Sequence, residues 1–178
     1  WGDSTVMASE LHVDAIKHSG GTSAITINSS GNVSIPGSVV QYQRSRTNSD
    51  LGTITSTSYT KLSSSLDVTI TPKFATSTLI VHASAHVYVN TNAYPSCFFA
   101  FYRDGSAISE HNTAITGGYV QVNTGQLGAF IPFIYAEESA NNTNSTTFSL
   151  YVKSNTGGNN SQFNDTANRW LAVMEIAQ

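Results

Sequence analysis

The chain has 178 residues, a length that holds one compact core with a short appendage rather than two ordinary domains. Only 11% of the residues are charged, well below the roughly 25% of average globular proteins, and the net charge is -3 with a pI near 5.9. Lysines and arginines form no cluster, and no apolar run approaches the length of a membrane span. Neither nucleic acid nor membrane insertion is therefore expected.

Polar but uncharged side chains dominate the composition, since 61 residues are Ser, Thr or Asn. The chain also carries eight Phe, eight Tyr and many Val and Ile, which is not the composition of a disordered segment. We therefore expect β-structure whose solvent-facing side is built from hydroxyls and amides. The chain starts at Trp1, no signal peptide is recognisable, and we expect it to be part of a longer protein.

The first part of the chain is typical of a short β-hairpin. Ala24–Ile27 and Val33–Ile35 alternate with the period of two that strands show, and the turn between them contains Gly31, which can adopt positive φ. The composition changes after this hairpin, so we predict a stalk over residues 1–36 and a head over residues 37–178. A two-stranded hairpin is marginal in water, so its apolar residues need partners, most simply from sister chains: Ile25, Ile27, Val33 and Ile35.

The head contains about eight to ten predicted strands, with turn residues every 8 to 12 positions or so and no helical periodicity. Leu79–Val89 alternates most clearly, because all its odd positions are apolar, and Asp104–Gly105 between two strands is a strong hairpin signature. We predict an all-β fold, an antiparallel jelly roll or β-sandwich preceded by the hairpin stalk. The predicted strands are 39–46, 53–62, 66–70, 79–89, 97–102, 107–111, 127–135, 147–153 and 170–176.

Three of these strands, 97–102, 127–135 and 170–176, are apolar on both faces. A sandwich of this size buries only one face of each sheet, and exposed apolar patches of that extent are rare on soluble monomers. We therefore expect one sheet to pack against another subunit.

Several stretches, in their order along the chain, carry a resemblance to known proteins. The segment Asp14–Val33 is similar to a phrase in tail-fibre and tail-associated proteins of phages, particularly those of marine bacteria and cyanobacteria. The chain resembles the C-terminal receptor-binding region of such a fibre over nearly its whole length. Its head is then similar to the trimeric jelly-roll heads of the tumour-necrosis-factor and complement-C1q type. The other matching stretches are Gly37–Gln41, Thr69–Pro72, Phe101–Gly105 and Ala172–Ile176.

The resemblance implies a homotrimer in the virion, in the phage tail and outside the producing cell, whose distal end recognises and attaches to the host surface. Its partners would be a bacterial surface glycan or outer-membrane receptor and, through a preceding N-terminal part, other tail proteins. Two alternatives of a different class stay open: a purely structural virion component, and a tailspike-like module that cleaves glycans.

The residues indicate no catalytic site and no cofactor, and we expect the chain not to be an enzyme. Glu137 and Glu138 are neighbours, so on a strand they point to opposite faces and cannot form the paired carboxylates of a glycosidase. Asp104 and Glu110 are possible members of such a pair, but Asp104 is better explained by its turn.

His82 and His86 lie four apart on a predicted strand and so share a face, where two imidazoles could bind a metal or respond to pH around a three-fold axis. Because no third ligand lies nearby in the sequence, packing or an interface explains them better, and we predict no metal site. Cys97 is the only cysteine, which excludes an intramolecular disulfide and favours a buried free thiol.

Four polar loops rich in Asn, Thr, Gly, Tyr and Gln are the candidate receptor contacts, at residues 90–96, 112–126, 139–145 and 155–168. Amides and hydroxyls hydrogen-bond to sugar hydroxyls, and an exposed tyrosine can stack on a sugar ring. Ordinary solvated loops would have the same composition. The candidate receptor-binding residues are Asn92, Tyr94, Tyr119, Asn141, Asn142 and Asn160.

Overall fold

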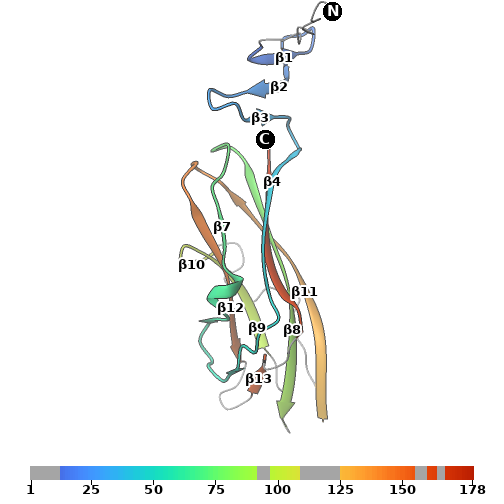
Figure 1. Cartoon of the computed structure of the whole chain (residues 1–178), viewed down its shortest axis with the longest axis vertical. Helices are drawn as coiled ribbons and strands as arrows, with labels where there is room; N and C mark the ends of the chain where they lie inside the picture. Colours follow the sequence, from blue (N-terminus) through green and yellow to red (C-terminus); the bar gives the residue numbers. More distant parts are fainter. Residues whose placement is uncertain (1–12, 92–96, 109–124, 155–159, 164–166) are drawn as a thin grey trace, which may run out of the picture.

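The computed structural model describes residues 13–91, 97–108, 125–154, 160–163 and 167–178. Within these ranges every regular element is a strand except one short 3-10 helix, η1, at Ser64–Leu66. No helix there has the length and apolar character of a membrane span. The strands form three antiparallel sheets, a small one near the N-terminus and two larger ones that face each other below it (Figure 1).

The small sheet contains the predicted hairpin, with β2 at Ser23–Ile27 and β3 at Val33–Ser34. The turn closes through a 2.8 Å bond from the Gly31 amide to the Asn28 carbonyl, and Gly31 has the expected positive φ of 76°. A third strand, β1 at Ala15–Lys17, pairs with β2 and was not predicted. Three residues are too few to show an alternation in the sequence.

One larger sheet is built around β8, and we call it the β8 sheet. β11 pairs with β8 along its whole length, so β14 and β13 must share the other edge of β8. β4 lies outside β14, and β5 lies outside β13. The strands are β4 (Val39–Thr47), β5 (Thr53–Ile54), β8 (Thr78–Thr91), β11 (Gly125–Ser139), β13 (Asn160–Gln162) and β14 (Arg169–Ile176).

The other larger sheet is built around β12, and we call it the β12 sheet. β9 pairs with one edge of β12 and carries β10 on its own outer edge. β7 and β6 pair with different parts of β12 on its other edge. The strands are β6 (Thr60–Lys61), β7 (Val68–Ile70), β9 (Cys97–Arg103), β10 (Ser106–Ala107) and β12 (Thr146–Ser154).

The order of the strands is that of a jelly roll. If β4, β7, β8, β9, β10, β11, β12 and β14 are numbered one to eight along the chain, the two sheets read 1-8-3-6 and 2-7-4-5. This interleaving of two Greek keys defines the jelly roll. The predicted all-β fold is therefore confirmed.

The core lies between the two sheets, and the predicted alternation places it correctly. The odd positions of β8 from Leu79 to Val87 are buried, as are Phe148, Leu150 and Val152 of β12, and they share one hydrophobic cluster. Each of these side chains larger than alanine contributes about 1.5–3 kcal/mol by leaving water. The even positions of β8 from Ile80 to His86 are half-buried on its other face.

Two of the predicted strands differ in the structure, and a third can be judged only in part. The predicted strand 66–70 begins only at Val68, because Leu66 belongs to η1. The segment 53–62 is not one strand, because β5 belongs to the β8 sheet and β6 to the β12 sheet. Between them a turn closes through bonds between Ser56 and Ser58, and the chain crosses from one sheet to the other. Of the predicted strand 107–111, Ala107 lies in a strand, and positions 109–111 lie outside the described residues.

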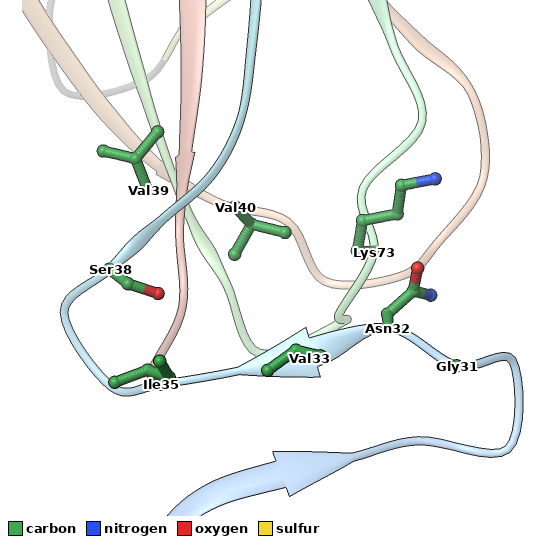
Figure 2. A pocket seen from close by; sticks show the side chains of 8 residues that line it. All are labelled: Gly31, Asn32, Val33, Ile35, Ser38, Val39, Val40 and Lys73. Carbon is green, nitrogen blue, oxygen red and sulfur yellow. The ribbon is translucent and has the colours of Figure 1, made fainter. Parts of the chain in front are cut away.

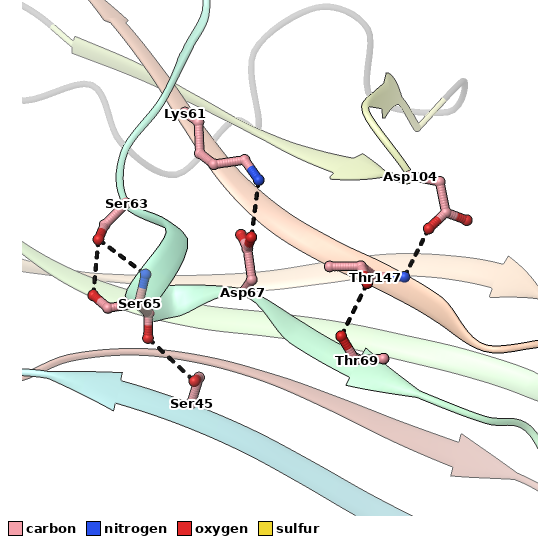
Figure 3. Close-up of polar contacts among 8 residues, drawn as sticks. All are labelled: Ser45, Lys61, Ser63, Ser65, Asp67, Thr69, Asp104 and Thr147. Atoms are coloured by element: carbon pink, nitrogen blue, oxygen red, sulfur yellow. Dashed lines mark hydrogen bonds and ion pairs between the residues drawn. The ribbon is translucent and has the colours of Figure 1, made fainter.

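The Asp104–Gly105 hairpin is confirmed, with φ of 49° and 82° at its two central residues, as a type I′ turn requires. The Asp104 carboxylate accepts a 2.8 Å bond from the Thr147 amide of β12 (Figure 3). It also accepts a 2.6 Å bond from the Thr146 hydroxyl. The preceding Arg103 donates to the Ser139 and Ala140 carbonyls at the end of β11. The turn therefore fastens β9 to the connection between β11 and β12.

A fully buried carboxylate fastens the first and last strands of the head. Glu175 of β14 accepts a 2.6 Å bond from the Gln41 amide of β4, and bonds of 2.9 Å and 3.1 Å from the Lys73 and Phe74 backbone amides. Gln41 also donates to the Thr71 carbonyl at 2.7 Å. The carboxylate thus joins β4, β14 and the connection between β7 and β8.

Replacing Glu175 with alanine should destabilise the protein by about 3 kcal/mol, because buried donors would lose a charged acceptor. Urea unfolding followed by circular dichroism measures the difference. The control is Gln43→Ala, an exposed residue of β4, which should change the unfolding free energy by less than about 0.5 kcal/mol. Equal midpoints for the two variants would contradict the anchoring role.

Candidate functional site

The two ends of the head are set by β8. Its first residue, Thr78, lies opposite Ser139 of β11 and Ile176 of β14, and Ile176 also pairs with Val39, where the chain enters the head from the small sheet. Its last residue, Thr91, lies opposite Gly125. We call these the stalk-side end and the far end. The 14 residues of β8 separate them by about 40 Å at ~3.3 Å per residue.

The predicted receptor residues that the structure describes do not all lie together. Asn141 and Asn142 lie in the connection between β11 and β12 at the stalk-side end. There Asn141 has a φ of 63° and Asn142 accepts a 2.8 Å bond from the Asn144 amide, so both shape a turn. Asn160 pairs with Asn90 near the far end. The remaining three, Asn92, Tyr94 and Tyr119, lie outside the described residues.

Two of the candidate carboxylates have partners among the described residues. Asp104 closes its turn, and Glu138 lies 3.9 Å from the Arg103 guanidinium. Glu137 and Glu138 are consecutive on β11, as predicted, and Glu110 lies outside the described residues. Within the part of the chain that the structure describes, no three of His, Cys, Asp and Glu gather as metal ligands would. Cys97 begins β9, opposite Ser154.

Apolar side chains are exposed on the small sheet and where it meets the head. Val33 and Ile35 are 49% and 44% exposed, and Val39 at the start of β4 is 55% exposed. Together with Asn32, Val40 and Lys73 they line an open groove of about 450 Å³, across which β3 faces the stalk-side end of the head (Figure 2). Ile16 and Ile27 are exposed as well. Of the four residues that the sequence predicts to need partners, Ile27, Val33 and Ile35 are exposed and Ile25 is half-buried.

The outer face of the β8 sheet carries an aromatic cluster formed by Tyr42, His82 and Trp170. The Trp170 ring meets the His82 ring edge-on at 5.3 Å between centroids, and Tyr42 lies 5.9 Å from His82 on the other side. Ala172, which pairs with His82, is fully buried beneath this layer. Half-buried apolar side chains continue the face along β8 and β14, namely Ile80, Met174 and Ile176.

The outer face of the β12 sheet is covered within the chain. Tyr102 and Tyr151 stack with centroids 3.7 Å apart, and the Lys153 ammonium lies 4.7 Å from the Tyr59 ring and 5.4 Å from the Phe98 ring. The Ala100 and Ser149 side chains between them are buried. The Phe98 and Tyr102 side chains on this face of β9 are half-buried. The strands predicted to be apolar on both faces divide between the two sheets, with β9 in the β12 sheet and β11 and β14 in the β8 sheet.

Burial of His82 in its cluster lowers the pKa of its imidazole below the ordinary value of 6.5. The unfolded chain therefore takes up the proton more readily than the folded one. His82 should contribute its full share of stability above pH 6.5 and lose it as the pH falls toward the lowered pKa.

The free energy of unfolding, measured with urea from about pH 5 to pH 8, should accordingly decrease on the acid side. His82→Phe, which keeps a ring between Tyr42 and Trp170, should flatten that decrease. His18→Gln, on an exposed turn of the small sheet, is the control and should leave the decrease as it is. An unchanged pH profile in His82→Phe would exclude His82 as its origin.

No protein-family model matches the chain, and no curated protein matches it. Among solved structures, a chain from T=1 particles derived from infectious bursal virus is similar, with a TM-score of 0.44 and 14% sequence identity. The match covers 82% of this chain and 39% of that chain, so this chain spans less than half the length of that relative. A likeness at this level says nothing of function.

Proposed function

We propose that this chain is the distal domain of a phage tail fibre, which attaches the virion to the host-cell surface as a homotrimer. The observation that carries the proposal is where the fibre-like stretches lie. Gly37–Gln41 enters β4, Thr69–Pro72 ends β7, Phe101–Gly105 ends β9, and Ala172–Ile176 ends β14. All four lie at the stalk-side end, next to the fibre-like segment Asp14–Val33 of the small sheet.

These stretches also bond to one another. Gln41 donates to both Thr71 and Glu175. These three residues belong to three different stretches, so one side chain connects them. The stretches that resemble tail-fibre proteins therefore form the junction between the small sheet and the head. The far end, about 40 Å away, would face the host, and its loops would be free to differ between phages.

A homotrimer is supported by two apolar surfaces that a single chain leaves open. One is the exposed set of aliphatic side chains on the small sheet and at its junction with the head. The other is the outer face of the β8 sheet over β14 and β8. Three copies around one axis would cover both surfaces.

Light scattering on a sizing column at low micromolar concentration should give about three times 19.0 kDa. Val33→Asp combined with Ile35→Asp should shift the mass toward one chain, because buried carboxylates would face one another near the axis. The matched control, Ser29→Asp combined with Ser30→Asp in the exposed turn of the same sheet, should stay trimeric. A wild-type monomer would contradict the trimeric arrangement.

Fluorescently labelled protein should adsorb to a strain that the phage infects and should compete with the virion for it. A monomeric variant should adsorb far more weakly, since linked sites gain roughly 10²–10⁴ in avidity. A structural virion component would not adsorb. A glycan-cleaving module would release reducing ends from the host polysaccharide, and Glu137→Gln would stop that release while leaving the trimer intact.

A further inference from the structure

Three of the four arginines of this sparsely charged chain lie close together on two paired strands. Arg44 and Arg46 of β4 lie opposite Ala172 and Trp170 of β14, and Arg169 begins β14 opposite Thr47. Arg169 is fully buried, whereas Arg44 and Arg46 are exposed. Among the described residues, neither exposed arginine has a carboxylate at ion-pair distance, which leaves two positive charges without a counter-ion there.

One of these arginines lines a pocket of about 310 Å³ where β4 ends and β14 begins. We call it the Arg46 pocket, and it is formed by Arg46, Thr47, Asn48 and Asn168. No hydrogen bond of the described chain engages the Arg46 guanidinium or the two carboxamides. The pocket therefore contains the Arg46 guanidinium and the carboxamides of Asn48 and Asn168, and all three groups can form hydrogen bonds to a ligand.

The walls of the pocket are held by the buried Arg169. Its guanidinium donates 3.3 Å bonds to the Ser49 and Ala167 carbonyls, the residues next to Asn48 and Asn168. A third bond of 3.1 Å runs from Nε to the His86 carbonyl of β8, and the guanidinium lies 5.7 Å from the Phe163 ring. One buried cation thus ties both lining segments to the core. A site fixed before binding loses less entropy when it binds.

We infer that the Arg46 pocket binds a saccharide that carries an anionic group, a carboxylate or a phosphate. A guanidinium fork matches either anion with two parallel hydrogen bonds, and carboxamides both donate to and accept from sugar hydroxyls. The volume is at the small end for ligand pockets, which suits one sugar ring. The inference rests on the proposed function, because it names the chemistry that the head would recognise on the host.

The pocket lies about half-way along the head. Arg46 lies opposite Trp170 of β14, and Trp170 lies opposite Ser84, which is the seventh of the 14 residues of β8, so the site is on the side of the head. β4 is also the edge strand of its sheet, outside the apolar centre of the proposed trimer interface. An extended polyanion such as a nucleic acid would need a long basic track, and the net charge of -3 provides none.

The test uses the whole chain and three sugars displayed on a polyacrylamide carrier: galacturonic acid, mannose 6-phosphate and galactose. Biolayer interferometry should show at least about tenfold tighter binding to one anionic sugar than to galactose. Added salt should weaken that preference. Whichever anionic sugar is preferred distinguishes a carboxylate from a phosphate ligand.

Arg46→Gln should remove the preference, and Arg46→Lys should restore only part of it, because an ammonium cannot form the two parallel bonds. The matched control is Arg44→Gln, the same change two residues away on the same face, which should alter binding by less than about twofold. Equal losses in the two glutamine variants, or no preference for either anionic sugar, would overturn the inference.

Cell adsorption separates this inference from the function on which it rests. If the wild type adsorbs to the host and Arg46→Gln adsorbs equally well, the pocket is not the receptor site while the fibre function stands. If the wild type does not adsorb, the proposed function itself fails.

Discussion

Burying a carboxylate in a protein costs free energy unless hydrogen-bond donors surround it. The donors that surround Glu175 all lie far from it in the sequence. Its donors, Gln41, Lys73 and Phe74, lie between 101 and 134 residues away in the sequence. The charge can therefore be satisfied only when the first strand of the head, the last strand and the connection between β7 and β8 have come together. This requirement closes the jelly roll at its stalk-side end and makes that end one cooperative unit.

The β12 sheet is fixed at the same end by a second charged group. Arg103 and Asp104 bind the end of β11 and the start of β12, so one hairpin holds three strand ends in register. The Glu175 anchor lies where the chain enters the head from the small sheet, and Figure 1 shows the C-terminus beside β4 there. The Arg103–Asp104 anchor holds the end of β11, whose Ser139 pairs with Thr78 at the same end of the head. In the proposed fibre, a mechanical force on the stalk would act on the head at the end where these hydrogen bonds connect its strands.

Local patterns in the sequence predicted those parts of the fold that local physics determines. The alternation of Leu79–Val89 identified a strand with one buried face, and Asp104 before a glycine identified a type I′ turn. The pattern could not show that Asn141 and Asn160 belong to opposite ends, because composition does not reveal which end a loop occupies. Counting strands could have done so, since successive antiparallel connections alternate between ends. Arg46 gave no indication in the sequence, because its pocket depends on the pairing of β4 with β14.

The positively charged side chains fall into two groups, those bonded to other groups of the fold and those without such a partner. Lys61 lies 2.9 Å from Asp67 (Figure 3), and Arg103 and Arg169 are bonded to backbone carbonyls, so these cations are used in holding the fold together. Arg46 has no such partner, although it lies in a pocket whose walls another arginine holds in place. A single exposed arginine gives only a weak contact with a sugar anion. Three such pockets at fixed spacing on a trimer would bind a repetitive surface polysaccharide much more strongly, because the second and third contacts form at high effective concentration. Weak individual sites on a rigidly mounted head are therefore compatible with firm attachment of a virion.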